Sequence, residues 1–171
     1  AQERGYDMTR SQTAFLPDVD FWTPREGKPE YHRNFKPRNI YISALLRREK
    51  YRYVVLAGSW NGYFNAGNFI KLGHLEGKEA FKKGMRAAIK EASSAAQKVL
   101  VLQTVPGLPA GLYDCSLRNA RFGLSNDCSL AMDLYKIQVA EVNKFFEELK
   151  KEFPEVIWVD PALIMCETDR C

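Results

Sequence analysis

The sequence predicts an α/β domain built on a mainly parallel sheet with helices on both of its faces. Short, nearly continuous apolar runs alternate along the chain with amphipathic segments of helical period. Such runs are typical of parallel strands covered on both sides, and the alternation is typical of strand–helix–strand units. The 171 residues suffice for one domain with a sizeable core, and 46% hydrophobic with 27% charged residues is an ordinary globular balance.

The N-terminal part carries the weakest patterns. Residues 1–5 (AQERG) resemble the end of a helix stopped by a glycine, which suggests that the sequence is a piece of a longer chain. Residues 6–15 show the faint alternation of a strand. Residues 16–37 contain four prolines, many charges and several aromatic side chains, so we expect a long, irregular, packed loop there.

The clearest strand follows this loop. Residues 37–49 (PRNIYISALLRRE) predict a helix, with Pro37 in its first turn and apolar residues at helical spacing. Residues 52–57 are a short, β-branched apolar run. The segment 53–63 (YVVLAGSWNGY) therefore predicts a buried parallel strand that ends in a loop, residues 58–73, rich in glycine, asparagine and aromatic residues.

The C-terminal half continues the alternation. Residues 77–97 and 129–153 predict long helices with apolar side chains on one face and charges on the opposite face. Residues 98–105 (KVLVLQTV) and 155–160 (EVIWVD) predict buried strands. Between the first of these strands and the second helix, residues 106–128 are rich in proline and glycine and predict a loop.

The resulting order, β, α, β, α, β, α, β, implies parallel strands joined by right-handed crossovers. In open sheets of this kind, sites form beyond the carboxyl ends of the strands. We therefore expect function from three loops, at residues 58–73, 106–128 and 161–171.

The net charge of +4 is mild, and basic residues alternate with acidic ones. This pattern is typical of a solvated surface and argues against a nucleic-acid partner, because no basic stripe carries interleaved aromatic residues. No apolar run of about 18 residues is present, so we expect no membrane span in the chain. Nothing resembles a Walker loop, a G-x-G-x-x-G turn or an H-E-x-x-H helix, so we expect neither a cofactor nor a metal.

The four cysteines form two local pairs in loop-like sequence. Even number and local spacing favour the disulfides Cys115–Cys128 and Cys166–Cys171, one of three possible connectivities. A zinc site is the rival interpretation, but zinc ligands usually come as tighter pairs on each arm, and free thiols are the remaining one. Disulfides would place the domain in an oxidising compartment, periplasmic or extracellular.

The start of the loop at residues 58–73 carries the first candidate site. Gly58 and Gly62 allow backbone N–H groups to approach a ligand closely, and Asn61 offers an amide donor. Such donors can hold the oxyanion that forms during acyl transfer. The alternative, a plain tight turn with Trp60 packed into the core, stays open.

Two further residues could carry chemistry. Ser59 could be a nucleophile if a base such as His74 lay in reach, but Ala57 breaks the full G-x-S-x-G pattern. His32, the other histidine, has the surroundings of a surface residue. Asp160 could orient a catalytic histidine, although capping of a following short helix is the favoured interpretation.

Three stretches together resemble one known family. VVLAGSWNGY, VLVLQTVPGLP followed by Cys115, and VIWVDPALIMCETDRC resemble, in order and approximate spacing, segments of the SGNH-type (GDSL-like) hydrolase domain fused to acyltransferase family 3 membrane proteins. The resemblance spans residues 5–171. It implies a flavodoxin-like, three-layer α/β/α sandwich, here a single domain over residues 1–171.

The resemblance also implies an activity and partners. This family is expected to O-acylate, usually O-acetylate, or de-esterify cell-surface polysaccharide, lipopolysaccharide or peptidoglycan by a serine nucleophile. The partners implied are a surface glycan acceptor, an acyl donor and a membrane-embedded acyltransferase portion of the same polypeptide. A periplasmic or extracellular location follows, with a tether to the inner membrane through a region outside this chain.

The chain departs from the family at its catalytic motifs. Neither the G-D-S of the nucleophile nor the D-x-x-H of the base occurs, so the chain looks like the central portion of the domain, without its first strand and C-terminal catalytic segment. The resemblance therefore assigns only Gly58, Trp60 and Asn61 to the site, and the chain alone is expected to be inactive. Trp60 matches the family pattern directly, and Asn61 resembles the oxyanion-hole asparagine of the wider superfamily.

Two other functions compete with this prediction. Because no complete triad is present, the chain could be a non-catalytic secreted α/β module that binds a glycan or a protein. It could also belong to a degenerate relative that has lost both catalytic motifs.

Overall fold

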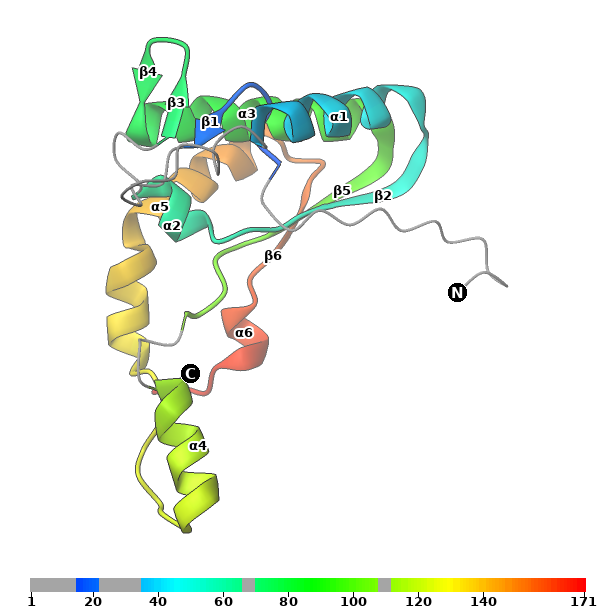
Figure 1. Cartoon of the computed structure of the whole chain (residues 1–171). Helices are drawn as coiled ribbons and strands as arrows, with labels where there is room; N and C mark the ends of the chain where they lie inside the picture. Colours follow the sequence, from blue (N-terminus) through cyan, green and yellow to red (C-terminus); the bar gives the residue numbers. More distant parts are fainter. Residues whose placement is uncertain (1–14, 22–34, 66–69, 108–111) are drawn as a thin grey trace.

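The computed structural model describes residues 15–21, 35–65, 70–107 and 112–171 (Figure 1). Its main sheet is fully parallel, and its strands, in spatial order, are β2 (Tyr51–Leu56), β5 (Ala96–Leu102) and β6 (Ile157–Val159). A small antiparallel sheet consists, in spatial order, of β1 (Asp20–Phe21), β3 (Ile70–Leu72) and β4 (Leu75–Glu76).

The helices connect these strands. They are α1 (Phe35–Arg48), α2 (Trp60–Phe64), α3 (Gly77–Ala95), α4 (Leu112–Phe122), α5 (Met132–Glu152) and α6 (Ala162–Met165). The predicted class, an α/β fold with a mainly parallel sheet flanked by helices, is confirmed.

Helices α1, α3 and α5 form one layer. Ser43 Oγ of α1 donates to Glu91 Oε2 of α3 at 2.9 Å, and the rings of Phe81 in α3 and Phe145 in α5 lie 6.0 Å apart. Phe146 of α5 reaches the sheet, where its ring lies 5.7 Å from that of Trp158. Right-handed crossovers in one direction along a sheet place their helices on the same face, which explains why α3 and α5 are neighbours.

Apolar burial holds this layer on the sheet. Val99 and Val101 of β5 and Leu56 of β2 point toward the helices and are buried. Each large side chain buried there contributes about 1.5–3 kcal/mol, whereas an exposed ion pair contributes about 0–1 kcal/mol. The 2.6 Å contact between Arg86 Nε of α3 and Glu152 Oε2 of α5 is therefore secondary to the packing.

The other face of the main sheet is not covered by the described helices. Tyr53, Val55 and Ile157 alternate with the buried positions and remain 47%, 54% and 41% exposed. The register aligns Val55 with Leu100 and Leu100 with Ile157, so these side chains form one continuous apolar surface. The second helical layer expected from the sequence is thus not formed by the residues that the structure describes.

Most predicted elements are present, with ends shifted by a few residues. The structure adds β4 just after the predicted loop at residues 58–73. It also adds elements inside predicted loops: β1, β3, α2 and α6, which are short, and the longer α4. The segments expected to be a helix end at residues 1–5 and a strand at residues 6–15 lie outside the described residues, apart from Phe15, which is buried in irregular structure.

Both predicted disulfides are confirmed. Cys115 of α4 pairs with Cys128, and Cys166 pairs with Cys171. The first bridge closes a hairpin, residues 112–128, which we call the α4 finger because it projects away from the sheet and helices (Figure 1). Among the described helices, none is long and apolar enough to cross a membrane.

Candidate functional site

The carboxyl ends of the three parallel strands meet at one edge of the sheet. Two hydrogen bonds join the segments that leave them. The indole Nε1 of Trp60 donates to the carbonyl of Leu102 at 2.6 Å, and the Gln103 N–H donates to the carbonyl of Val159 at 2.8 Å. This edge is where the topology predicts a site, and it is the first candidate.

Trp60 begins α2 immediately after the loop that follows β2. Its side chain is fully buried, and its ring packs edge-on against Phe81 at 6.2 Å. The bond to Leu102 ties the end of β2 to the end of β5. Trp60 thus lies in the core, as the alternative interpretation of this loop proposed, and any contribution to a site can only come from positioning its neighbours.

Those neighbours are more accessible. Ser59 is exposed, while Gly58 and Asn61 are half-buried. The side-chain oxygen of Asn61 accepts a hydrogen bond from Asn65 Nδ2 at 2.8 Å. Since that oxygen is occupied as an acceptor, the Nδ2 group of Asn61 is the part of its amide that can donate to a ligand.

His74 does not support a Ser–His pair at this edge. His74 is exposed in the turn between β3 and β4, away from the segments that leave the parallel strands. His32 lies outside the described residues. Ser59 and His74 share no hydrogen bond within the described part of the chain, so nothing in the geometry activates Ser59.

Asp160 follows β6 and acts as a cap. Its Oδ1 accepts a hydrogen bond from the N–H of Ala162, the first residue of α6, at 2.9 Å. The capping role favoured by the sequence is therefore confirmed.

Tyr135 and Thr104 belong to the same edge, and sequence reasoning missed them. The Tyr135 hydroxyl donates to the carbonyl of Thr104 at 2.8 Å, which ties α5 to the end of β5. Burial, and secondarily the negative charge of Asp160, raises the pKa of Tyr135 to about 12. Thr104 Oγ1 is buried without a hydrogen-bond partner among the described residues. The sequence offered one signal for this contact: Tyr135 lies on the apolar face of the predicted helix at residues 129–153. A buried tyrosine hydroxyl there needs a hydrogen-bond acceptor.

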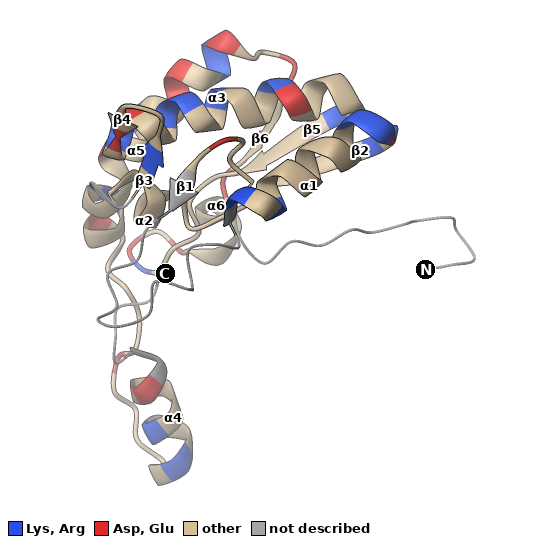
Figure 2. Ribbon diagram, turned by 45° about the horizontal axis from the view of Figure 1, so that its top comes forward, with Lys and Arg blue, Asp and Glu red and all other residues tan. Residues whose placement is uncertain are grey.

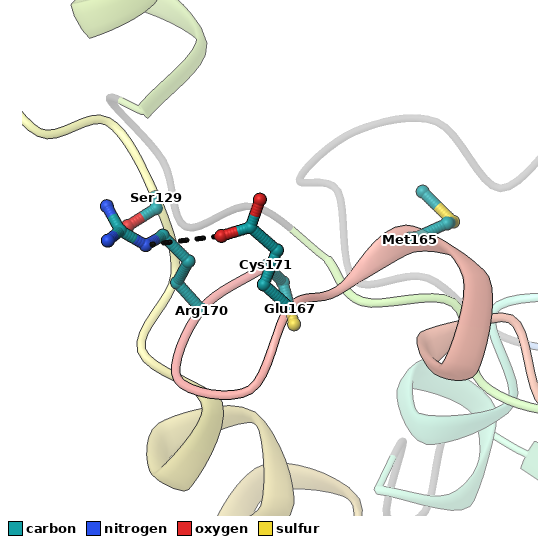
Figure 3. Close-up of a pocket in the computed structure, with 5 residues that line it drawn as sticks. All are labelled: Ser129, Met165, Glu167, Arg170 and Cys171. Atoms are coloured by element: carbon teal, nitrogen blue, oxygen red, sulfur yellow. Dashed lines mark ion pairs between the residues drawn. The ribbon is translucent and has the colours of Figure 1, made fainter.

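A shallow pocket of about 280 Å³ lies in the segment after α6 (Figure 3). Ser129, Met165, Glu167, Arg170 and Cys171 line it, and Arg170 Nε lies 3.8 Å from Glu167 Oε2. Backbone hydrogen bonds in both directions between Leu130 and Cys171 hold this segment against the chain that leads into α5. The lining is both polar and apolar, and Arg170 Nε also lies 3.5 Å from Asp169 Oδ1, so its guanidinium already faces two carboxylates.

A comparison with protein-family models identifies the class of protein to which this sheet and its edge belong. The model described as "SGNH domain (fused to AT3 domains)" matches residues 1–171. The chain belongs to this family. Comparisons with curated proteins and with solved structures found no match.

Membership supports hydrolase or acyltransferase chemistry in general, and a membrane acyltransferase portion in the same polypeptide as this SGNH domain. The described part of the SGNH domain holds no group of three or more His, Cys, Asp or Glu side chains placed to bind a metal ion.

Proposed function

We propose that this SGNH domain forms part of an enzyme that transfers an acyl group, usually acetyl, to or from cell-surface polysaccharide, lipopolysaccharide or peptidoglycan. The observation that carries the proposal is the family match over residues 1–171, which joins the domain to membrane acyltransferases. The parallel sheet supports it, because its carboxyl edge is where such a fold places a site.

In this proposal the start of the loop after β2 is one wall of the acyl-transfer site. The backbone N–H of Gly58 and the Nδ2 group of Asn61 would donate to the oxyanion of the tetrahedral intermediate. Loss of one such donor in an acyl-transfer enzyme typically costs about 2.7–4 kcal/mol of transition-state stabilisation. Trp60 would hold this wall in place through its bond to the carbonyl of Leu102.

The covalent step is assigned to residues that this sequence does not contain, since it holds neither G-D-S nor D-x-x-H. A serine hydroxyl would attack the carbonyl of the acyl donor while a histidine takes its proton. The rest of the donor would leave with that proton. An acceptor hydroxyl would then attack the acyl-serine and pass its proton through the histidine to the serine oxygen, which leaves as the acyl group stays on the acceptor. In this proposal the 171-residue chain alone should therefore not turn over an ester.

The same proposal assigns a location and partners. Two disulfides favour an oxidising compartment, periplasmic or extracellular. The domain would be tethered to the inner membrane through the acyltransferase portion of the polypeptide, which would supply the acyl donor. The acceptor would be a surface glycan.

The test is ester hydrolysis by the full-length polypeptide, with p-nitrophenyl acetate as substrate. Asn61→Ala should lower kcat by about 10²–10³-fold if Nδ2 stabilises the oxyanion. Asn65→Ala is the matched control, because it removes the donor to Asn61 Oδ1 and to the Asn61 carbonyl but leaves Asn61 Nδ2 in place, and it should cost much less. Trp60→Phe keeps an aromatic ring but removes the N–H, so it should lower both stability and kcat modestly.

Two results would count against the proposal in different ways. If Asn61→Ala kept wild-type activity, this loop would not be part of the acyl-transfer site, although the proposed enzyme class would still stand. Turnover by the pure 171-residue chain would show that a nucleophile within it had been overlooked.

A non-catalytic glycan-binding or protein-binding module is the second candidate, favoured by the absence of a complete triad from the sequence. Tight glycan binding by the full-length polypeptide, with no ester turnover, would establish it.

A further inference from the structure

The α4 finger, residues 112–128, stands apart from the packed layers of the domain. Among the described elements, no helix or strand packs extensively against α4, and the finger projects well beyond the sheet and the other helices (Figure 1). It leaves and rejoins the domain between β5 and α5, on the carboxyl side of the sheet.

Several links make the finger rigid. The Cys115–Cys128 disulfide joins α4 to the returning segment at the base. Farther out, Asn119 Nδ2 donates to the carbonyl of Asn126 at 2.7 Å, and Asn126 Nδ2 donates to Asn119 Oδ1 at 3.0 Å. Gly123, with φ +64°, ends the helix in the left-handed conformation that glycine adopts without strain. The finger therefore presents its side chains in a fixed arrangement.

The outer part of the finger is both apolar and basic. Leu117, Phe122 and Leu124 are 51%, 61% and 50% exposed. Leu117 and Phe122 share one helix face with Arg118 and Arg121. Together with Asp114 of the first turn, these side chains line a shallow groove of about 430 Å³. The Arg121 guanidinium lies 5.4 Å from the centre of the Phe122 ring.

Charge is divided along the length of the finger. Asp114 lies in the first turn of α4, near the domain, and Asp127 lies beside the disulfide at the base. Arg118 and Arg121 lie toward the tip, as the red and blue segments of α4 show in Figure 2. The part that reaches farthest from the domain is thus cationic as well as apolar.

We propose that the α4 finger docks on an anionic lipid bilayer, with Phe122 and Leu124 entering the interface and Arg118 and Arg121 contacting lipid phosphates. Exposed Phe and Leu side by side with Arg is the chemistry that interfacial helices use on anionic membranes. The family joins this domain to a membrane acyltransferase portion of the same polypeptide, which would hold it near a bilayer. The inference rests on that membership and not on the proposed acyl transfer.

The finger alone binds a bilayer weakly, and the membrane portion of the same polypeptide raises its local concentration at the lipid surface. Two arginines and two apolar side chains bind a free bilayer weakly, with partitioning that is measurable at high lipid concentration, and a domain held at the membrane needs little more to adopt one orientation. That orientation directs the tip of the finger toward the lipid.

Co-sedimentation of the purified chain with protein-free vesicles tests this inference. Binding should occur on vesicles of equal parts phosphatidylglycerol and phosphatidylcholine, fall with rising NaCl, and be absent on phosphatidylcholine alone. Arg118→Gln with Arg121→Gln, and separately Phe122→Ser with Leu124→Ser, should each lower the partition coefficient by about tenfold.

Matched controls lie elsewhere on the surface. Leu163→Ser with Ile164→Ser removes two exposed apolar side chains of α6, and Lys83→Gln with Lys90→Gln removes two exposed cations of α3. Both control pairs should bind vesicles like the wild type.

A second measurement reports insertion directly. Phe122→Trp adds a tryptophan at the tip of the finger. If the tip inserts, brominated lipids should quench a larger share of the tryptophan fluorescence in this variant than in the wild-type chain. Absence of binding to anionic vesicles would overturn the inference, and so would equal losses of binding in the control pairs. Binding only to membranes that carry the acyltransferase portion would also overturn it, because the finger would then contact protein and not lipid.

Discussion

Tyr135 connects the first turn of α5 to the end of β5 through its bond to the Thr104 carbonyl. A tyrosine in an unfolded chain has a pKa of about 10, whereas the folded domain raises the pKa of Tyr135 to about 12. Below pH 10 the hydroxyl is protonated in both states, and the bond contributes its full stabilisation. Between pH 10 and 12 only the unfolded chain loses the proton, so this stabilisation falls as the pH rises.

Tyr135→Phe should therefore destabilise the chain by about 0.5–1.5 kcal/mol at pH 8, and the difference from wild type should shrink toward pH 11. Urea denaturation at a series of pH values measures it. Tyr41→Phe, at an exposed tyrosine of α1, is the control and should leave stability unchanged at each pH. A difference that stays constant or grows with pH would contradict the burial of the Tyr135 hydroxyl in its bond to Thr104.

At this scale the sequence predicts some residues better than others. The cysteine pairs and the Asp160 cap could be read from spacing, because the partners in each lie no more than 13 residues apart. The position of Trp60 could not be read, since an aromatic residue after a strand suits either a core or a site. What decides it is Leu102, which lies far from Trp60 in the sequence.

At the scale of elements, Gly84 shows how closely α3 is packed. A Cβ atom there would lie 2.5 Å from Val19 Cγ2 and 3.5 Å from Leu16 Cβ, in the segment before β1. Glycine in the middle of a helix costs about 1 kcal/mol relative to alanine, so its presence reflects the close approach of that segment. The contact fixes residues 16–19 against α3.

Gly84→Ala should lower the free energy of unfolding by about 1–2 kcal/mol, because overpacking outweighs the gain in helix propensity. In a Val19→Ala background the same change should be neutral or stabilising, since the obstructing methyl group is gone. Chemical denaturation of the four chains gives the coupling energy of the pair. Additive effects, with no coupling, would show that Val19 does not contact this face of α3.

The elements that sequence patterns missed are short or unusual. The strands β1, β3 and β4 have two or three residues each, too few for any period to show. Helix α4 is long enough, but it lies in a stretch rich in proline, glycine and asparagine. Its helical spacing was detectable at Asp114, Leu117, Arg118, Arg121 and Phe122, yet that face is half charged and does not resemble a core stripe.

At the scale of the whole molecule, the main sheet has two unlike faces. Val101 points toward α3 and is fully buried, whereas Val55, on an adjacent strand, points to the other side and is 54% exposed. Parallel sheets are ordinarily covered on both faces. The fold class followed from the alternation of strands and helices. That alternation did not predict that helices would pack on only one face of the sheet, because the face depends on the direction of successive crossovers.

Val55→Lys in the 171-residue chain should therefore change stability by no more than about 0.5 kcal/mol, as substitutions at exposed positions do. It should also reduce fluorescence of the dye 1-anilinonaphthalene-8-sulfonate, which binds exposed apolar surface. Val101→Lys, the counterpart on the helical face, should prevent folding. A loss of several kcal/mol from Val55→Lys would mean that residues outside the described part cover this face.

The strand order of the main sheet, β2-β5-β6, is also the order in which the ribosome makes these strands. Each new strand finds its partner already synthesised, and α3 or α5 is complete before the strand that follows it. Among the described strands, the main sheet can therefore grow in one direction as the chain emerges, with none inserted between two earlier ones. The edge of β5 stays unpaired only until β6 emerges, which limits the time in which it could pair with another chain.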